Sequence, residues 1–222
     1  MAMIINNLRA AALLLTFASI ASLGGCEALG VASESAGHTV NAKYVPNKAD
    51  SMLVLVESYQ HDLSDSGIEA EHLSAALSKA IADEKIASLV DPQALEKLRD
   101  ADPDQFAPMS IAEIGRRVGA KQVLYVNIDL AEIEHPIGGG QMRGRMEAIV
   151  KIVDSTSGNT RWPRDSTSET MQITTDWIPD NANKTDADIR AQMADQMAQD
   201  IGKVFHDYHV EEQPLEKVNM DG

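Results

Sequence analysis

The chain has 222 residues, of which 44% are apolar, which is enough for one domain with a sizeable core plus additional segments. Its net charge of −15 at pH 7 excludes the basic surface on which nucleic acids and anionic lipid headgroups bind, so no nucleic-acid partner is expected. With only 4% aromatic residues, it also lacks the stacking platforms used for single-stranded nucleic acids.

The first 26 residues have the pattern of a secretory signal. Arg9 is the only charged residue before a short apolar run, residues 10–23, which is too short to span a bilayer because about 20 apolar residues are needed. The run ends in Leu23-Gly24-Gly25-Cys26, which resembles the lipobox of bacterial lipoproteins. This resemblance implies cleavage between Gly25 and Cys26 and acylation of Cys26, the chain's only cysteine. The alternative is an ordinary secreted protein whose cysteine is incidental.

Acylation of Cys26 predicts a protein held at the bacterial envelope and facing the periplasm. Two or more acyl chains give a stable membrane anchor. Glu27 differs from the aspartate that resembles an inner-membrane retention signal in enteric bacteria, so we expect the outer membrane. The expected organisation is a signal peptide at 1–25, the lipidated cysteine and a flexible tether at 26–49, an α/β domain at 50–210, and a disordered tail at 211–222.

The first part of the domain is expected to alternate strands and helices. A near-continuous apolar run at 52–56 predicts a strand buried on both faces, within residues 51–59. Ser66 and Glu69 form a capping box that predicts the start of a helix. That helix extends to about Asp83 and places four apolar residues at helical spacing, namely Ile68, Leu73, Leu77 and Ile81. A short strand at 86–90, a short helix at 92–98 and a loop at 100–108 follow.

The stretch from 110 to 154 organises the rest of the chain. A helix begins at a capping box of Ser110 and Glu113 and ends near Gly119. Two strands follow, at 121–134 and 143–154, separated by the glycines 138–140, and they should pair antiparallel in the middle of the sheet. The residues expected on the shared face are Leu124, Val126, Ile128, Leu130, Met146, Ala148, Val150 and Ile152, with Ile149 and Val153 on the other face.

The remaining residues complete the expected fold. They predict a turn at 155–159, strands at 160–164 and 168–177, a loop at 178–184, and a long helix that is capped by Thr185 and has its last apolar position at Tyr208. The predicted fold class is therefore α/β: a single mixed sheet with a central antiparallel hairpin, helices packed on it and a long C-terminal helix.

Two segments resemble a family of small periplasmic α/β domains. The segments are 111–120 leading into 122–126, and 148–162, which contains a strand, Val153-Asp154, a glycine turn and a tryptophan. The family includes the N-terminal domain of TolB, the penicillin-binding-protein activator LpoB and the periplasmic part of the curli-export lipoprotein CsgG. The resemblance implies an envelope role. The long pore-forming hairpins of CsgG have no counterpart here.

Four arginines and two tryptophans are candidates for a partner surface. Basic residues that cluster on an acidic protein can bind a carboxylate-bearing partner or form ion pairs with neighbouring acids. Each tryptophan is either a core residue or an exposed binding residue, and the sequence does not distinguish the two. The residues are Arg143, Arg145, Arg161, Arg164, Trp162 and Trp177.

Metal, cofactor and catalytic signatures are incomplete. Asp100, Asp102 and Asp104 start like a calcium loop, but Gln105 and Ile111 stand where the glycine and the glutamate belong. His206 and His209 are only two possible zinc ligands. The glycines at 138–140 lack the Lys-Ser or Lys-Thr of a phosphate loop. We therefore expect no metal and no cofactor, and, without a nucleophile motif, no enzyme.

The function predicted from sequence is non-catalytic. A lipid-anchored protein of this kind is expected to bind another envelope protein in assembly or secretion. The alternatives are a ring-forming subunit of an export complex, and a small-ligand-binding or hydrolytic domain that uses the loops at 100–108 and 162–177.

Overall fold

The computed structural model describes residues 37–58, 66–179 and 182–211, and it divides the chain into two units. β1 (His38–Val40) and β9 (Tyr208–Val210) form a two-stranded sheet, and all of its residues except Tyr208 belong to the smaller unit. The larger unit comprises residues 41–208 and is described below by itself. Within the described ranges, no helix has both the length and the apolarity needed to cross a bilayer.

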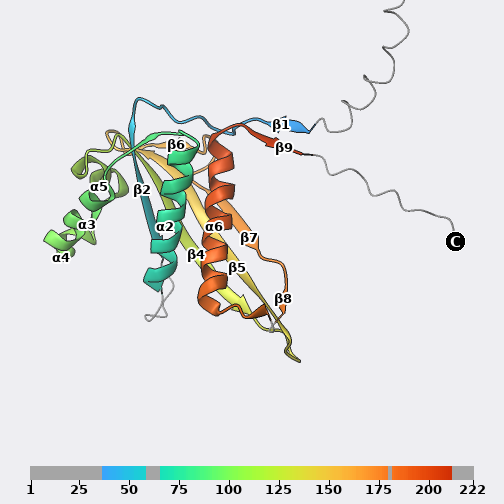
Figure 1. Ribbon diagram of the computed structural model, residues 1–222. Coiled ribbons are helices and arrows are strands. Elements are labelled where there is room, and N and C mark those ends of the chain that lie inside the picture. The colour runs from blue at the N-terminus through green and yellow to red at the C-terminus, as the bar shows by residue number, and fades with distance from the viewer. Residues whose placement is uncertain (1–36, 59–65, 180–181, 212–222) are drawn as a thin grey trace, which may run out of the picture. The chain divides into compact units, whose positions relative to one another are not determined.

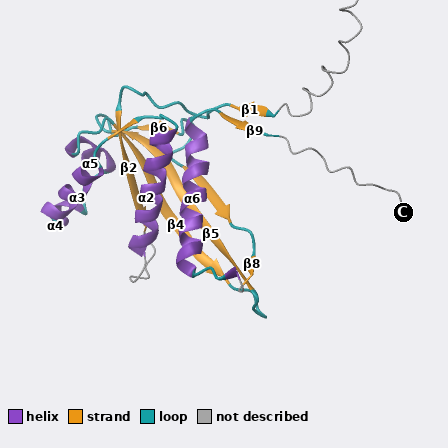
Figure 2. Cartoon of the chain, viewed as in Figure 1, coloured by secondary structure: helices purple, strands orange, loops and turns teal. Residues whose placement is uncertain are grey.

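The larger unit is built on a seven-stranded mixed sheet, which confirms the predicted α/β class (Figures 1 and 2). The order is β3-β2-β4-β5, and three short strands, β6, β7 and β8, share the far side of β5. β2 is parallel to β3 and β4, whereas β5 is antiparallel to all its neighbours. The bounds are β2 Ser51–Ser58, β3 Ser88–Leu89, β4 Gln122–Glu134, β5 Gln141–Asp154, β6 Thr160–Trp162, β7 Glu169–Thr174 and β8 Ile178–Pro179.

Two long helices, α2 (Ser66–Asp83) and α6 (Asp186–Phe205), cover one face of this sheet and enclose the main core (Figure 1). The predicted cap of α6 is confirmed: Thr185 accepts from the Asp188 amide, and the Asp188 carboxylate accepts in return from the Thr185 amide. The helix ends at Phe205, earlier than predicted, and Tyr208 lies in β9. The cap of α2 involves the Ser66 side chain, which lies outside the described residues.

Three short helices pack on one end of the opposite face. They are α3 (Pro92–Ala101), α4 (Pro103–Phe106) and α5 (Ile111–Arg117), and they enclose a second, smaller apolar cluster with β2 and β4. The loop predicted at 100–108 is wrong in part, because the Asp102 carboxylate accepts from the Gln105 amide (3.0 Å) and so begins α4. The stop predicted at Gly119 is confirmed: Gly119 has φ +80° and follows shortly after the end of α5.

The central hairpin has the predicted pairing, with one correction. Val126 lies opposite Val150, and Leu124 opposite Ile152, on the face buried under the helices. An irregularity between Ile128 and Leu130 shifts the register, so Ala131 reaches the core in place of Leu130. One smaller expectation also fails, because a short strand, β8, forms inside the expected loop at 178–184. The helix predicted after Ser66 is confirmed as α2, and of its four spaced apolar residues Ile68 alone is half exposed.

Part of the predicted tether is fixed to the domain. The amides of Lys43 and Tyr44 both donate to the carbonyl of Val204 near the end of α6 (2.8 and 3.1 Å). The ring of Tyr44 meets that of Phe205 edge to face, with 6.4 Å between centroids. These contacts satisfy a helix carbonyl that lacks an intrahelical partner, so the folded domain starts at residue 41 and not at 50. The signal, Cys26 and the tail at 212–222 lie outside the described residues.

Candidate functional site

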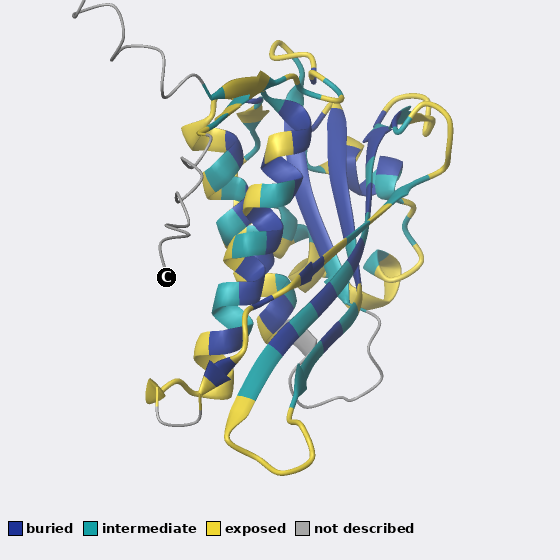
Figure 3. Cartoon of the chain, turned by 90° about the vertical axis from the view of Figure 1, so that its right-hand side faces the viewer, coloured by how far each residue is buried: buried dark blue, intermediate teal, exposed yellow. Residues whose placement is uncertain are grey.

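The central hairpin extends past the ends of the helices that cover the sheet (Figure 1). We call this extension, residues 132–145 together with 177–179, the hairpin arm. Its turn is formed by residues 135–140, which are all exposed, as Figure 3 shows at the lower end of the molecule. Gly138, Gly139 and Gly140 all have positive φ, a conformation that other residues rarely adopt, so the glycine run is needed for this turn.

Opposite charges lie face to face along the two strands of the arm. Glu134 is directly opposite Arg143, with 2.6 Å between Oε2 and Nε, and Glu132 is opposite Arg145, with 3.6 Å between Oε1 and Nη1. Such cross-strand pairs stabilise a sheet by about 0.2–1 kcal/mol each. The arm therefore keeps its register beyond the apolar core, and its charges are largely neutralised.

Two large apolar side chains are exposed on this neutralised arm. Ile137, in the turn, is fully exposed, and Trp177 is 42% exposed. The guanidinium of Arg143 lies 4.4 Å from the centre of the Trp177 ring, a cation–π contact that fixes the indole against the strand. Next to it, Ile178 is buried in β8, opposite Met142. The arm thus presents an isoleucine and a tryptophan on an ordered backbone.

The base of the arm is held closely by α6. A β-carbon placed on Gly144 would lie 2.5 Å from the sulfur of Met193 and 2.9 Å from Cγ2 of Ile189, so only glycine allows this approach. The amide of Thr175 donates to the Gly144 carbonyl (2.9 Å), and the amide of Gly144 donates to Thr175 Oγ1 (2.9 Å). The arm therefore leaves the domain from a packed and hydrogen-bonded base.

The structure separates the six candidate partner residues into two groups. Arg143, Arg145 and Trp177 belong to the hairpin arm, and the Gln172 amide also accepts from Arg145 Nε (2.7 Å) when its oxygen faces the guanidinium. The other three candidates follow β5 at the opposite end of the strand. Arg164 is exposed, whereas Trp162 is 4% exposed and packs edge-on against Phe205 with 5.3 Å between ring centroids. Trp162 is therefore a core residue, and its assignment to a partner surface is wrong.

Arg161 belongs to a structural cluster that we call the polar clamp, formed with Asp50, Gln122 and Asp154. Its Nη1 donates to Asp50 Oδ2 (2.8 Å) and its Nε to Asp154 Oδ2 (2.9 Å). Gln122 is fully buried and donates to the carbonyls of Asn47 and Asp50 (3.2 and 3.1 Å). The clamp ties the start of β2, the start of β4 and the end of β5 together. Arg161 is thus used within the domain.

Asp154 makes the stability of the domain sensitive to acid. Hydrogen bonds from the Ser157 amide and then from Arg161 lower the pKa of Asp154 from 3.8 to about 2. A lowered folded-state pKa gives stability that is complete above the unfolded-state value and is lost as the pH falls through the folded-state value.

We expect Asp154→Asn to make the free energy of unfolding less dependent on pH in acid. Between about pH 5 and about pH 2, the free energy of unfolding should fall less in this variant than in the wild type, because asparagine does not titrate. Urea unfolding at a series of pH values measures this difference. Asp165→Asn, in an exposed loop, serves as the control and should keep the wild-type slope. Equal slopes for the wild type and Asp154→Asn would contradict the lowered pKa of Asp154 in the folded state.

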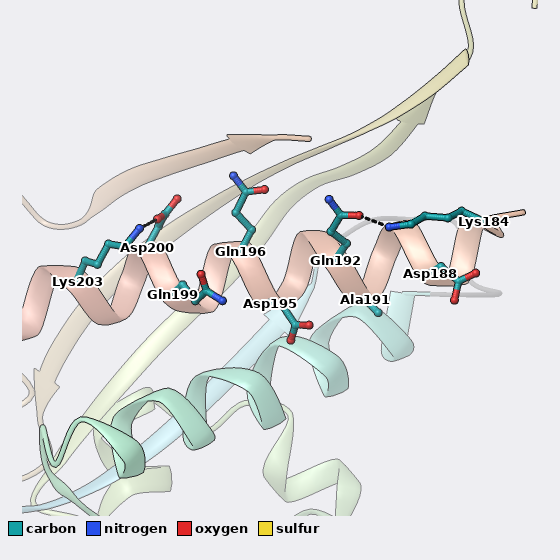
Figure 4. Close-up of a pocket in the computed structure, with 9 residues that line it drawn as sticks. All are labelled: Lys184, Asp188, Ala191, Gln192, Asp195, Gln196, Gln199, Asp200 and Lys203. Carbon is teal, nitrogen blue, oxygen red and sulfur yellow. Dashed lines mark hydrogen bonds and ion pairs between the residues drawn. The ribbon is translucent and has the colours of Figure 1, made fainter. Parts of the chain in front are cut away.

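The described residues contain no metal cluster, and two hollows lie away from the predicted loops. Within 37–58, 66–179 and 182–211, no three potential ligands lie close enough to hold a metal ion. One open hollow runs along α6 between Lys184 and Lys203 (Figure 4), and a second lies between α6 and α2. Neither is lined by residues of 100–108 or 162–177. The first hollow is lined by side chains that bond to one another, as expected for a solvated helix face. Lys184 donates to Gln192 and Lys203 donates to Asp200, both at 2.8 Å.

No protein-family model and no curated protein matches the sequence. Among solved structures, the chain is similar to lipoprotein GNA1162 from Neisseria meningitidis, with 15% identity, 69% of this chain and 99% of that chain covered, and a TM-score of 0.45. It is similar to hypothetical protein CT253 from Chlamydia trachomatis, with 8% identity, coverage of 70% and 96%, and a TM-score of 0.42. It is also similar to a minor lipoprotein from Acinetobacter baumannii, with 9% identity, coverage of 69% of this chain and 90% of that chain, and a TM-score of 0.39. At these values the likeness carries no argument about activity or partners.

Sequence reasoning missed Ile137, the most exposed apolar side chain of the arm. The available signal was an isoleucine placed directly before three glycines, in a turn where neither flanking strand could bury it. Sequence reasoning treated the arginines as a cluster and allowed for ion pairs with nearby acids, but it named no partner, because the direct pairing of Glu134 with Arg143 depends on the register of the hairpin.

Proposed function

We propose that the protein is a lipid-anchored envelope protein that acts without catalysis, by binding another protein through the hairpin arm. The observation that supports this most is the exposure of Ile137 and Trp177 on a hydrogen-bonded extension beyond the core. The anchor follows from the lipobox-like segment that ends in Cys26. We place the protein at the outer membrane, facing the periplasm, because Glu27 differs from an inner-membrane retention signal.

The arm has the composition of a binding surface. Tryptophan and arginine are enriched among residues that dominate interface energies, and here Arg143 stacks on Trp177. The paired charges around them, Glu132, Glu134 and Arg145, would form the polar rim of such an interface. Because the strands are already ordered, binding would cost less conformational entropy than the ordering of a flexible loop.

The charges of the arm favour binding over a reaction. Each of its two arginines has a carboxylate partner on the facing strand, and the side chains of these pairs are about one-third to two-fifths exposed. Charges that are already paired across the two strands hold the shape of the arm, so the arm is suited to recognition.

Photo-crosslinking in intact cells tests the proposal. A photoreactive amino acid replaces Ile137 in one variant and Trp177 in another, and each should form a covalent adduct with the same envelope protein, identified by mass spectrometry. Val45 provides the matched control because it is an exposed apolar residue (64%) outside the arm. Adducts of equal yield and identity from all three positions, or none from the arm, would contradict the proposal.

A further inference from the structure

One edge of the sheet is left open at β7. The opposite edge ends in β3, which has only two residues. Of the short strands beside β7, β6 is followed by Pro163 and β8 contains Pro179. β7 has six residues, no proline and an uninterrupted register with β5. Natural sheets usually protect such an edge with charges, prolines or bulges. Residues 170–174 carry no charge, in a chain where 24% of residues are charged.

The backbone of β7 shows which groups face outward. The Thr175 amide donates to Gly144 of β5, so residue 175 points toward β5. In an antiparallel strand the direction of the backbone groups alternates with each residue. The N–H and C=O groups of Thr170, Gln172 and Thr174 therefore point away from β5, and no other strand of the described residues pairs with them. These three residues form a row of donors and acceptors ready for a further strand.

We infer that β7 pairs with β7 of a second copy of this chain, antiparallel, around a two-fold axis at Gln172. In this register Thr170 lies opposite the partner copy's Thr174, and Gln172 lies opposite itself. These are the residues whose backbone groups point outward, so each facing pair can exchange two N–H···O=C bonds. β7 is not part of the hairpin arm, although the Gln172 amide accepts from Arg145 of the arm. The inference does not depend on the proposed function.

The side chains of β7 suit this register. Met171 falls opposite Ile173 of the second copy on the face that packs under α6, and Met171 is only partly buried in one copy. Glu169 falls opposite Thr175, and its carboxylate is already paired with Lys43 at 2.7 Å. No like charges meet across the seam. This self-complementarity favours a second copy over an unrelated extended segment.

Disulfide trapping tests the register. Directly opposite residues in a hydrogen-bonded antiparallel pair have their Cα atoms about 5.5 Å apart, which a disulfide can span. Gln172→Cys in the full-length chain should therefore form a covalent dimer in isolated envelopes treated with copper phenanthroline. Thr170→Cys alone should not, because two copies of residue 170 would be about 13 Å apart. The unmodified chain, with Cys26 alone, sets the background.

The matched variants make the test decisive. Thr170, Gln172 and Thr174 are all exposed on the same face of β7, so reagents can reach a cysteine at each position. Gln172→Cys also removes the acceptor of the Arg145 guanidinium, so the reactivity of each cysteine is measured separately. Thr170→Cys and Thr174→Cys carried on two differently tagged copies should crosslink to each other several-fold more than either does alone. Circular dichroism and maleimide labelling check that each variant is folded and reactive. A folded, reactive Gln172→Cys that stays monomeric, that crosslinks no better than Thr170→Cys, or that crosslinks only to another protein would overturn the inference.

Discussion

Replacement of Arg190 with methionine should lower the free energy of unfolding by about 3 kcal/mol, because it leaves a buried carboxylate without its cation. Arg190 of α6 pairs with Glu69 of α2, whose side chain is only 5% exposed, and the second carboxylate oxygen of Glu69 has no hydrogen-bond partner among the described residues. Methionine keeps the length and packing of the arginine stem, so the expected loss comes from the charge. Urea unfolding at neutral pH, followed by circular dichroism, measures it.

Replacement of the other partner, Glu69→Gln, should lower the free energy of unfolding by less than Arg190→Met does. This asymmetry would identify the buried charge of Glu69 as the cause. In Glu69→Gln the guanidinium of Arg190, whose side chain is 26% exposed, can turn to water and remain solvated. In the double variant Glu69→Leu with Arg190→Met, both charges are removed, and much of the stability lost in Arg190→Met should return. Equal costs for the two single variants would show that the pair acts through packing and not through the buried charge.

Trp162→Ala should lower the free energy of unfolding by about 3–5 kcal/mol, the usual cost of truncating a buried aromatic residue. Trp162 is 4% exposed and meets Phe205 edge to face, and Phe205 in turn meets Tyr44 of the segment at 41–49. The loss should therefore also free that segment, so that amide hydrogen exchange at Lys43 and Tyr44 becomes faster.

Trp177→Ala is the matched comparison for this prediction. Trp177 is 42% exposed and contacts Arg143 outside the core, so its loss should cost about 1 kcal/mol or less. Thermal unfolding of both variants under the same conditions provides the test. A similar loss of stability in the two variants would contradict the assignment of Trp162 to the core and of Trp177 to the arm.

The sequence was informative where burial imposes a local pattern. The alternation from Leu124 to Ile128 and from Met146 to Ile152 predicted two paired strands, because each strand buries the same face along its length. The cap at Thr185 predicted the start of α6 for a similar reason, since the hydrogen bonds involved span only three residues.

Features that depend on distant contacts could not be predicted. Glu69 was interpreted as part of a helix cap, whereas its partner Arg190 lies 121 positions away in the sequence. Arg161 meets Asp50 across 111 positions. Trp162 and Trp177 both lie in strands predicted from the sequence, and only the three-dimensional packing places one against Phe205 and the other outside the core.

The hairpin arm could be predicted only in part. The glycine run predicted a turn, but the exposure of Ile137 depends on how far the hairpin extends past α6. The irregularity after Ile128 that brings Ala131 into the core also sets the pairs Glu132–Arg145 and Glu134–Arg143. A change of register by one residue would have moved these charges to the opposite face.

The most direct test of the proposed function compares photo-crosslinking at position 137 in cells that express the anchored chain and its Cys26→Ser variant. Our account predicts one dominant protein adduct at position 137 that is absent at the Val45 control position, together with the release of Cys26→Ser from the membrane fraction. Our account would be contradicted if Cys26→Ser stayed in the membrane fraction. It would also be contradicted if position 137 yielded only the adducts found at the Val45 control position.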